Sequence, residues 1–200
     1  KHVNLEFWQD FVPAMMDAAV TAGRDEFFVF GEVFSGDPRL LSHYTTRADF
    51  PAVLDFRFQG HVRSYASQGG NSDNLRDLFA NDDYFTDADS NVYALPTFIG
   101  NHDIGRFGYF LNADNSGQSD ADLVARSELA TALMFFARGM PVIYYGDEQG
   151  FTGSGGDKDA RQDMFANFVP DYADDVLIGT SATTSDDNFD TTHTIYQALA

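Results

Sequence analysis

Helix-like and strand-like segments alternate along the whole of this 200-residue chain, and this alternation constrains the fold more than any other feature. Apolar residues recur at helical spacing over residues 5–19, and Gly23 marks a plausible end of that helix. Short runs rich in β-branched and aromatic residues follow at 27–30, 52–58, 94–99 and 142–145. The clearest helical pattern, around residues 129–136, separates the last two runs. Such alternation is typical of an α/β fold built on a parallel sheet or barrel.

Three segments give more local predictions. Residues 27–30 form a continuous apolar run, Phe-Phe-Val-Phe, which is typical of a strand buried on both faces. A polar turn at residues 69–71 is expected to precede a short helix capped by Ser72 or Asp73. From residue 151 to about 190 the sequence is rich in Gly, Asp, Ser and Thr and loses its periodicity. A loop of that length in a compact domain is more often functional than idle.

Charge and composition argue against several classes of function. The formal net charge is −19 and the chain has only two lysines, so its surface does not suit nucleic-acid phosphates. Two explanations of the acidity stay open: a surface that keeps molecules apart by self-repulsion, and an adaptation to salty surroundings. No stretch approaches the roughly 18 uninterrupted apolar residues of a membrane span. The absence of cysteine excludes disulfides and thiol chemistry and leaves the redox compartment undecided.

Carboxylates stand directly after three of the four predicted strands. Glu32 follows the first, Asp103 ends an Asn-His-Asp sequence after the third, and Asp147 follows the fourth. In a (β/α)₈ barrel the active site is built at the carboxyl ends of the strands. Several carboxylates at one rim suit glycoside hydrolysis, in which a protonated acid serves the leaving oxygen while others stay ionised near the developing oxocarbenium ion. Each carboxylate taken alone is more often a helix cap than a catalytic group.

Four segments, taken in order, resemble signature segments of the α-amylase family. They are the opening Lys1-His2, Phe-Gly-Glu-Val-Phe at 30–34, Phe-Ile-Gly-Asn-His-Asp at 98–103, and Gly-Met-Pro-Val-Ile-Tyr-Tyr-Gly-Asp-Glu at 139–148. The resemblance implies a parallel (β/α)₈ TIM barrel, of which residues 1–200 are expected to be the C-terminal half, about strands 5 to 8. The remaining strands and the C-terminal β domain of the family are expected outside this chain, which reads as a cut from a longer one.

The resemblance also implies roles for residues that follow the strands. Glu32 matches the general acid/base of the family, and Asp103 matches the aspartate that stabilises the transition state by binding sugar hydroxyls. His102 matches the histidine that contacts the sugar in the cleavage subsite, and Asn101 packs beside it. Separately from the resemblance, the position of Arg106 three residues after Asp103 suggests that it steadies this carboxylate electrostatically.

Further substrate contacts are implied at the chain's start and in the long loop. Lys1 and His2 match residues that line the leaving-group side. In many members of the family, the backbone carbonyl at the position of His2 also ligates a structural calcium ion, whose other ligands are expected upstream. Asp157 and Arg161 keep the Asp-x-x-x-Arg spacing that the family uses to hold sugars on the non-reducing side. A surface ion pair is the alternative for these two residues.

Other conspicuous side chains are better explained by structure than by function. Trp8 sits on a helical apolar stripe, and Tyr144 and Tyr145 belong to a predicted strand, so all three are expected to be core residues. The isolated histidines lack the spacing of metal ligands and are expected at the surface or in hydrogen bonds: His43, His61 and His193.

The expected function is that of a retaining glycoside hydrolase acting on α-1,4-glucans such as starch or maltodextrin. Its partners are expected to be the glucan and the remainder of the enzyme chain, without nucleic acid or membrane, and the family implies an extracellular or periplasmic location. The alternatives are an α-glucan transglycosylase or another α-glucosidase of the same family, or a non-catalytic carbohydrate-binding relative. Because the nucleophilic aspartate of the family precedes Lys1 by three residues, the 200 residues alone are expected not to hydrolyse starch.

Overall fold

The computed structural model describes residues 2–200. Its strands are β1 (Phe30–Gly31), β2 (Ala52–Val53), β3 (Pro96–Thr97) and β4 (Met140–Pro141). Its α-helices are α1 (Leu5–Thr21), α2 (Pro38–Arg47), α3 (Phe56–Val62), α4 (Asp73–Phe79), α5 (Phe107–Asp114), α6 (Asp120–Phe136), α7 (Pro170–Ala173) and α8 (Thr194–Leu199). Shorter helical turns are η1 (Arg63–Ser67, a π-helix), η2 (Asp82–Phe85), η3 (Val92–Ala94), η4 (Asp147–Gln149) and η5 (Asp157–Ala160).

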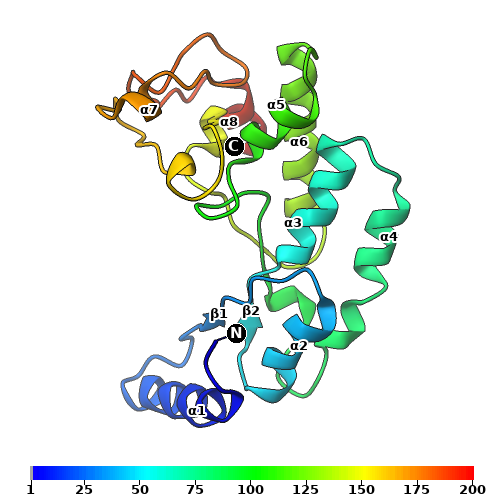
Figure 1. Ribbon diagram of the computed structural model, residues 1–200. Helices are drawn as coiled ribbons and strands as arrows, with labels where there is room; N and C mark the ends of the chain where they lie inside the picture. The colour runs from blue at the N-terminus through cyan, green and yellow to red at the C-terminus, as the bar shows by residue number, and fades with distance from the viewer. Residues whose placement is uncertain (1) are drawn as a thin grey trace.

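The strands form two neighbouring parallel pairs in sequence order. β1 pairs with β2 and β3 pairs with β4, both in parallel register. The backbone N–H of Asp55, just after β2, donates to the carbonyl of Pro96 in β3 at 3.0 Å and joins the two pairs. Each strand is separated from the next by at least one helix (Figure 1). This confirms the parallel α/β architecture predicted from the alternation, because parallel neighbours need a crossover connection.

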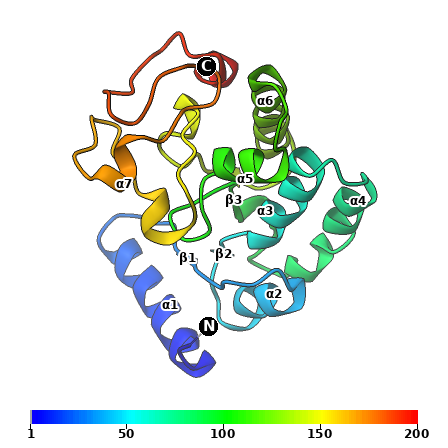
Figure 2. The same cartoon turned by 45° about the horizontal axis from the view of Figure 1, so that its top comes forward.

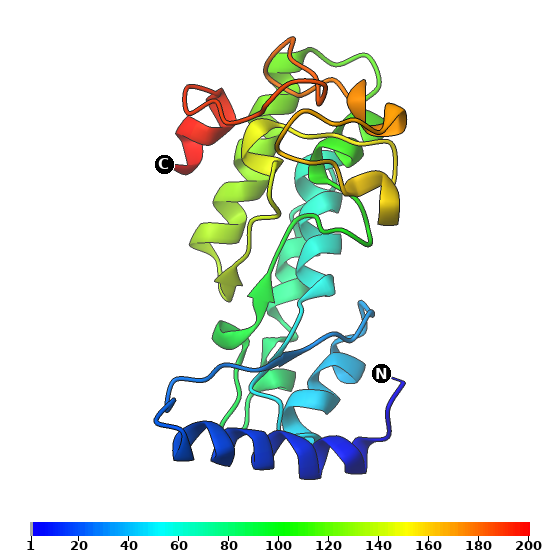
Figure 3. The same ribbon diagram turned by 90° about the vertical axis from the view of Figure 1, so that its left-hand side faces the viewer.

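Buried side chains form two clusters. One lies among α1, α2, β1 and β2 and includes Val12, Leu41 and Val53. The other lies among α3, α5, α6 and α8 and includes Phe58 and Leu111. Figure 3 shows α1 lying across one end of the molecule, with β3 and β4 leading away from it, and Figure 2 shows the same helix along the rim beside β1 and β2. In residues 2–200, every helix is too short or too polar to cross a bilayer.

Helix α1 follows the predicted apolar spacing. Val12 is buried, and the ring centroid of Trp8 lies 5.1 Å from that of Phe50 in the same core, which confirms Trp8 as a packing residue. Pro13 sits inside the helix without ending it. Gly23, with φ of +70°, follows where the helix ends, as predicted. The predicted helix around 129–136 is the second half of α6.

The prediction that the run at 27–30 is buried on both faces is wrong. Phe28 and Phe30 are 43% and 51% exposed, and their rings stack with centroids 6.0 Å apart. The fourth run differs in a similar way, because β4 precedes it and Val142 and Ile143 are 45% and 42% exposed. The reason is that no part of residues 2–200 covers this face of the strands.

The second and third runs form shorter strands than predicted. β2 ends at Val53 because the carboxylate of Asp55 accepts the N–H of Phe58 at 2.8 Å and so starts α3. The third run holds only β3, after the turn η3. The turn at 69–71 and the helix α4 behind it are confirmed, although Ser72, its N-cap residue, forms no side-chain cap. Residues 151–190 hold only η5 and α7, so the long loop is confirmed.

Candidate active site

A tight turn after β3 presents His102 and Asp103. The side-chain oxygen of Asn101 accepts the N–H groups of Asp103 and Ile104, both at 2.9 Å. The backbones of Asn101 and Gly105 exchange two hydrogen bonds of 3.1 Å across the turn. Asn101 therefore fixes the backbone that carries these residues, while its predicted packing beside His102 stays a prediction.

Four of the predicted site residues form one cluster of ionisable side chains. His102 Nε2 lies 3.3 Å from Asp103 Oδ1, and Arg161 Nη2 lies 3.2 Å from the same oxygen. Arg161 also pairs with Asp157 at 3.1 Å. The side chains of Asp103 and Arg161 are 35% and 46% exposed, so solvent and solutes reach them. Asp157 and Arg161 do form the surface ion pair considered as an alternative, and the pair stands against Asp103.

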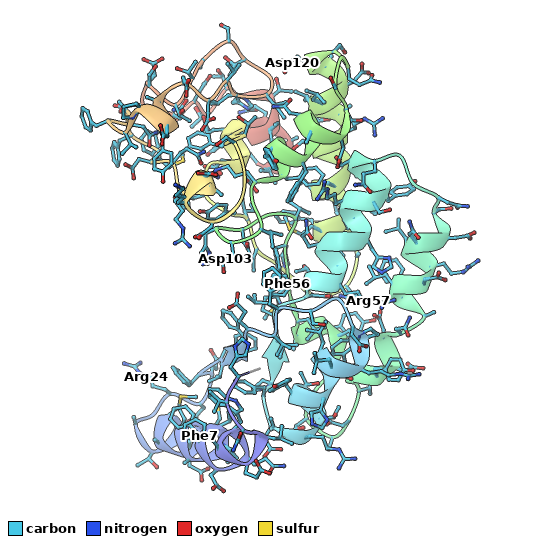
Figure 4. The ribbon with its side chains drawn as sticks, viewed as in Figure 1. Phe7, Arg24, Phe56, Arg57, Asp103 and Asp120 are labelled. Atoms are coloured by element: carbon cyan, nitrogen blue, oxygen red, sulfur yellow. The ribbon has the colours of Figure 1, made fainter. Side chains whose placement is uncertain are left out.

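The loop that carries Asp157 packs backbone to backbone on the turn of Asp103. The N–H of Asp157 donates to the carbonyl of Asp103 at 3.0 Å. A Cβ on Gly156 would lie 2.6 Å from that carbonyl oxygen, so only glycine allows the approach. Asp157 itself has a φ of +52°, which is unusual for a non-glycine residue and is often found at functional sites. Figure 4 shows Asp103 lying below this loop.

Arg106 does not contact Asp103, so the prediction that it steadies this carboxylate is wrong. Its fully buried guanidinium donates to Gln162 Oε1 at 2.7 Å and to the carbonyl of Tyr145 at 2.6 Å. It also lies 3.4 Å from Asp147 Oδ1. The backbone reverses at Gly105, with φ of +112°, so the next side chain enters the interior.

Asp147 and Glu148 have structural positions rather than places at the rim. The Asp147 side chain is only 11% exposed, and burial raises its pKa to about 7, with Arg106 opposing the rise and Glu148 adding to it. Glu148 Oε2 accepts the N–H of Gly146 at 2.9 Å and caps the turn after β4. This cap is the structural alternative considered for strand-end carboxylates.

The tyrosines after β4 differ from their prediction as core residues. Tyr145 is 42% exposed. Tyr144 is half-buried, its hydroxyl donates to the carbonyl of Ala160 at 2.8 Å, and burial raises the pKa of its phenol. Tyr144 therefore holds the backbone next to Arg161.

Glu32 stands apart from the cluster of ionisable side chains around Asp103. It follows β1 and is exposed, on the same face of the strand as Phe30. It lines a cavity of about 260 Å³ together with aromatic residues that include Trp8 and Phe50. Within the described chain it forms no hydrogen bond or ion pair, so its carboxylate is free to meet a ligand. His2 is exposed and Lys1 lies outside the described residues, so their predicted roles stay predictions.

Among residues 2–200, no group of three or more His, Asp or Glu side chains could hold a metal ion. His193 is buried and its two ring nitrogens contact the Ile178 carbonyl at 2.9 Å and the Ile195 N–H at 3.2 Å, which confirms it as a hydrogen-bonded residue. His43 is exposed, as expected. His61 is half-buried, and this burial is the main cause of its lowered pKa, with Arg57 adding to the effect.

The family model of the α-amylase catalytic domain matches residues 3–192. The chain belongs to the α-amylase family. Over all 200 residues it is 48% identical to an α-amylase of Streptomyces lividans, of which it covers 22%. Over 142 residues, 68% of the chain, it is 37% identical to a cyclomaltodextrin glucanotransferase of Bacillus licheniformis and covers 18% of that protein. It therefore spans about a fifth of the length of these relatives.

Solved structures of the family share the fold. An α-amylase of Geobacillus thermoleovorans in complex with acarbose superposes with a TM-score of 0.66 at 30% identity, over 80% of this chain and 33% of that one. A γ-CGTase of the alkalophilic Bacillus clarkii gives a TM-score of 0.69 at 24% identity, over 99% of this chain and 24% of that one. The family fold is the (β/α)₈ barrel, to which the parallel strands of this chain belong.

Sequence reasoning missed one buried residue of the site, Gln162. It directly follows Arg161 in a stretch without periodicity, and its side chain is fully buried. A polar amide among Gly, Asp and Ser residues gives no signal of burial, because such loops are ordinarily exposed. The only available hint is its position next to a candidate sugar ligand.

Proposed function

We propose that this chain supplies the acid/base side of a retaining glycoside hydrolase that acts on α-1,4-glucans. The observation that carries the proposal is the cluster of Asp103, His102 and Arg161 at the turn that follows β3. Glu32 directly follows β1, which belongs to the neighbouring pair of parallel strands. Carboxylates at the carboxyl ends of parallel strands are where a barrel of this kind places its chemistry. Family membership adds the substrate class.

Each residue has a distinct task in this proposal. Glu32 donates a proton to the leaving oxygen and later takes one from the attacking water. Asp103 accepts hydrogen bonds from sugar hydroxyls, which strengthen as the ring gains positive charge. His102 contacts the sugar at the point of cleavage. Asp157 and Arg161 hold the next sugar on the non-reducing side.

The 200 residues are proposed to form about strands 5 to 8 of the barrel. The nucleophile of the retaining mechanism is proposed to come from a segment outside them. A retaining glycosidase needs a second carboxylate about 5 Å from the acid, on the other side of the sugar. The chain by itself is therefore expected to bind glucan without hydrolysing it. Lys1 and His2 would line the leaving-group side, next to that nucleophile.

Transglycosylation is the second candidate, because the chain is 37% identical to a cyclomaltodextrin glucanotransferase over 142 residues. Hydrolysis and transglycosylation share the glycosyl-enzyme intermediate and differ in the acceptor that attacks it. The acid/base role of Glu32 is the same in both. Hydrolysis adds one reducing end for each bond cleaved, whereas transfer to a sugar hydroxyl, cyclisation included, leaves the number of reducing ends unchanged.

Calcium and location complete the proposal. Calcium takes six to eight oxygen ligands, and the described residues offer no group of three or more carboxylates or histidines that could hold a metal ion. The backbone carbonyl of His2 is proposed to give one ligand to an ion held mainly by other segments. We propose a location outside the cell or in the periplasm, which the α-amylase family implies.

A chimera tests the function directly. The 200 residues replace the matching segment of the Streptomyces lividans α-amylase, which is 48% identical to them, and reducing-sugar release from soluble starch is measured. We expect an active chimera, and a loss of about 10²–10⁴-fold in kcat for Glu32→Gln. Glu6→Gln, at an exposed carboxylate of α1, should keep full activity. An inactive chimera, or an active Glu32→Gln variant, would contradict the proposal.

A further inference from the structure

The buried side chain of Gln162 connects three segments around the candidate active site. Its Nε2 donates to the carbonyl of Asp159 at 2.9 Å and to Asp175 Oδ2 at 2.7 Å. Its Oε1 accepts the Nε–H of Arg106 at 2.7 Å. An amide with both donors and an acceptor used in a water-excluded place holds its partners in a single arrangement.

Arg106 extends this connection to the turn of Asp103. It follows Asp103 by three residues, and its guanidinium carbon lies 4.6 Å from the ring centroid of Tyr144 and 4.8 Å from that of Phe151. One of its nitrogens, Nη2, is buried without a partner in the described chain. Burying a guanidinium with an unpaired nitrogen costs stability. Its contacts with Gln162 and the aromatic rings offset part of this cost and fix its position.

The loop that carries Asp157 and Arg161 is therefore held by side-chain hydrogen bonds to the backbone carbonyls of two consecutive residues. Gln162 binds the carbonyl of Asp159, and the hydroxyl of Tyr144 binds that of Ala160 at 2.8 Å. The next side chain, Arg161, reaches Asp103. A shift of this backbone would move the guanidinium of Arg161 away from the carboxylate it pairs with.

We propose that Gln162 is a positioning residue, which acts through Arg106 and the Asp159 carbonyl to set Arg161 and Asp157 against Asp103 and so determines glucan affinity. The inference rests on the proposed function for its effect on catalysis. It predicts that loss of Gln162 raises KM much more than it lowers kcat, because the residues it places bind sugar away from the bond that breaks.

Two variants in the chimera separate positioning from general stability. Gln162→Leu removes all three hydrogen bonds, and we expect KM for soluble starch to rise about 10-fold with kcat within about 3-fold of the parent. The matched control is Gln149→Leu. Gln149 is also buried, at 2% exposure, and its side chain bridges to the backbone of Asp190 at 2.9 and 3.2 Å, away from the site residues.

A donor–acceptor exchange gives the sharper test. Gln162→Glu keeps an acceptor for Arg106 but sets a second carboxylate against Asp175, so KM should rise. Adding Asp175→Asn places an amide donor opposite the new carboxylate, and KM should fall by at least about 3-fold from that of the single variant. A KM for Gln162→Leu that changes no more than that of Gln149→Leu, or no recovery in the double variant, would overturn the proposal.

Hydrogen exchange in the 200-residue chain tests the positioning without any activity. The N–H of Asp157 bonds to the carbonyl of Asp103, so its exchange rate reports whether the loop stays on the turn. We expect faster exchange of this amide in Gln162→Leu than in Gln149→Leu. Equal rates would contradict the inference even with an active chimera. An inactive chimera with a selective rise in exchange would instead contradict the proposed function alone.

Discussion

At the scale of single residues, Arg106 and Asp147 form a buried pair whose charge depends on pH. Burial is the main cause that raises the pKa of Asp147 to about 7 from an ordinary value of 3.8, while Arg106 opposes the rise. At a pH between these two pKa values, Asp147 keeps its proton in the folded protein, whereas the unfolded chain has released it. The contribution of this group to stability is therefore greatest at low pH and is lost as the pH rises through 7.

Replacing Asp147 by asparagine should remove this pH dependence, since the amide stays neutral. Relative to Asp147→Asn, the unfolding free energy of the parent should fall by on the order of 4 kcal/mol between pH 4 and pH 9, because one pKa unit corresponds to about 1.36 kcal/mol. Urea unfolding of both proteins across this range measures it. Asp10→Asn, at an exposed site on α1, should follow the parent at every pH. A constant difference between parent and Asp147→Asn would exclude this account of the carboxyl.

How far the site could be predicted differs from residue to residue. The resemblance of the Asn-His-Asp sequence and the Asp-x-x-x-Arg spacing to those of the family selects Asp103, His102, Asp157 and Arg161, and these side chains do meet. The prediction that Arg106 is the partner of Asp103 is wrong. Distance along the chain cannot show that a backbone reversal sends one arginine inwards while another arrives from a loop 58 residues later.

At the scale of elements, hydrophobic runs predict the strands and helices but not their ends. The helical spacing of α1 and the apolar pattern of α6 come from faces packed on a core, so both are predictable. The strand predicted over 52–58 stops at Val53 because one side chain, Asp55, caps the next helix. Helices α2 and α5 are not among the predicted helices, although the apolar residues of α2 gather on one face. A single capping hydrogen bond can end a strand within a β-rich run and start a helix. The periodicity of the sequence does not predict such a boundary.

The same Asp55 belongs to a buried ionic group that ties α3 to the segment before β4. Arg138 pairs with Asp55, and its Nε lies 3.0 Å from Asp82 Oδ1 in η2. The side chains of Arg138 and Asp55 are 6% and 1% exposed. Burial raises the pKa of Asp82, while its hydrogen bond from Arg138 lowers it. The arginine is thus the positive partner that these two carboxylates share, and it holds three segments together.

Arg138→Met should destabilise the fold by about 3–5 kcal/mol, because it leaves two poorly solvated carboxylates without their positive partner. Urea or thermal unfolding at pH 7 measures the loss. The matched control is Arg76→Met, whose arginine also pairs with two aspartates, at 2.8 and 3.1 Å, but with a side chain that is 67% exposed. That variant should lose less than about 1 kcal/mol. Equal losses would show that burial does not decide the strength of these pairs.

At the scale of the whole molecule, an apolar face and a large charge act against each other. Phe28, Phe30, Val142 and Ile143 lie in or next to β1 and β4 and are 42–51% exposed. The outer edges of β1 and β4 are unpaired within residues 2–200. Exposed aromatic surface beside open strand edges favours association between copies. The net charge of −19 opposes it, through a repulsion whose range depends on salt.

Salt should therefore decide whether the isolated 200-residue chain associates. The screening length falls from about 30 Å at 0.01 M to about 3 Å at 1 M ionic strength, whereas apolar contact is short-ranged and unscreened. Sedimentation velocity should show monomers at the lower NaCl concentration and larger species at the higher one. The double variant Phe28→Ser and Phe30→Ser has the same charge and less of the apolar face, so it should associate less at about 1 M. Association of the parent that is independent of salt would contradict the role given to charge, and unchanged association of the double variant would contradict the role given to the face.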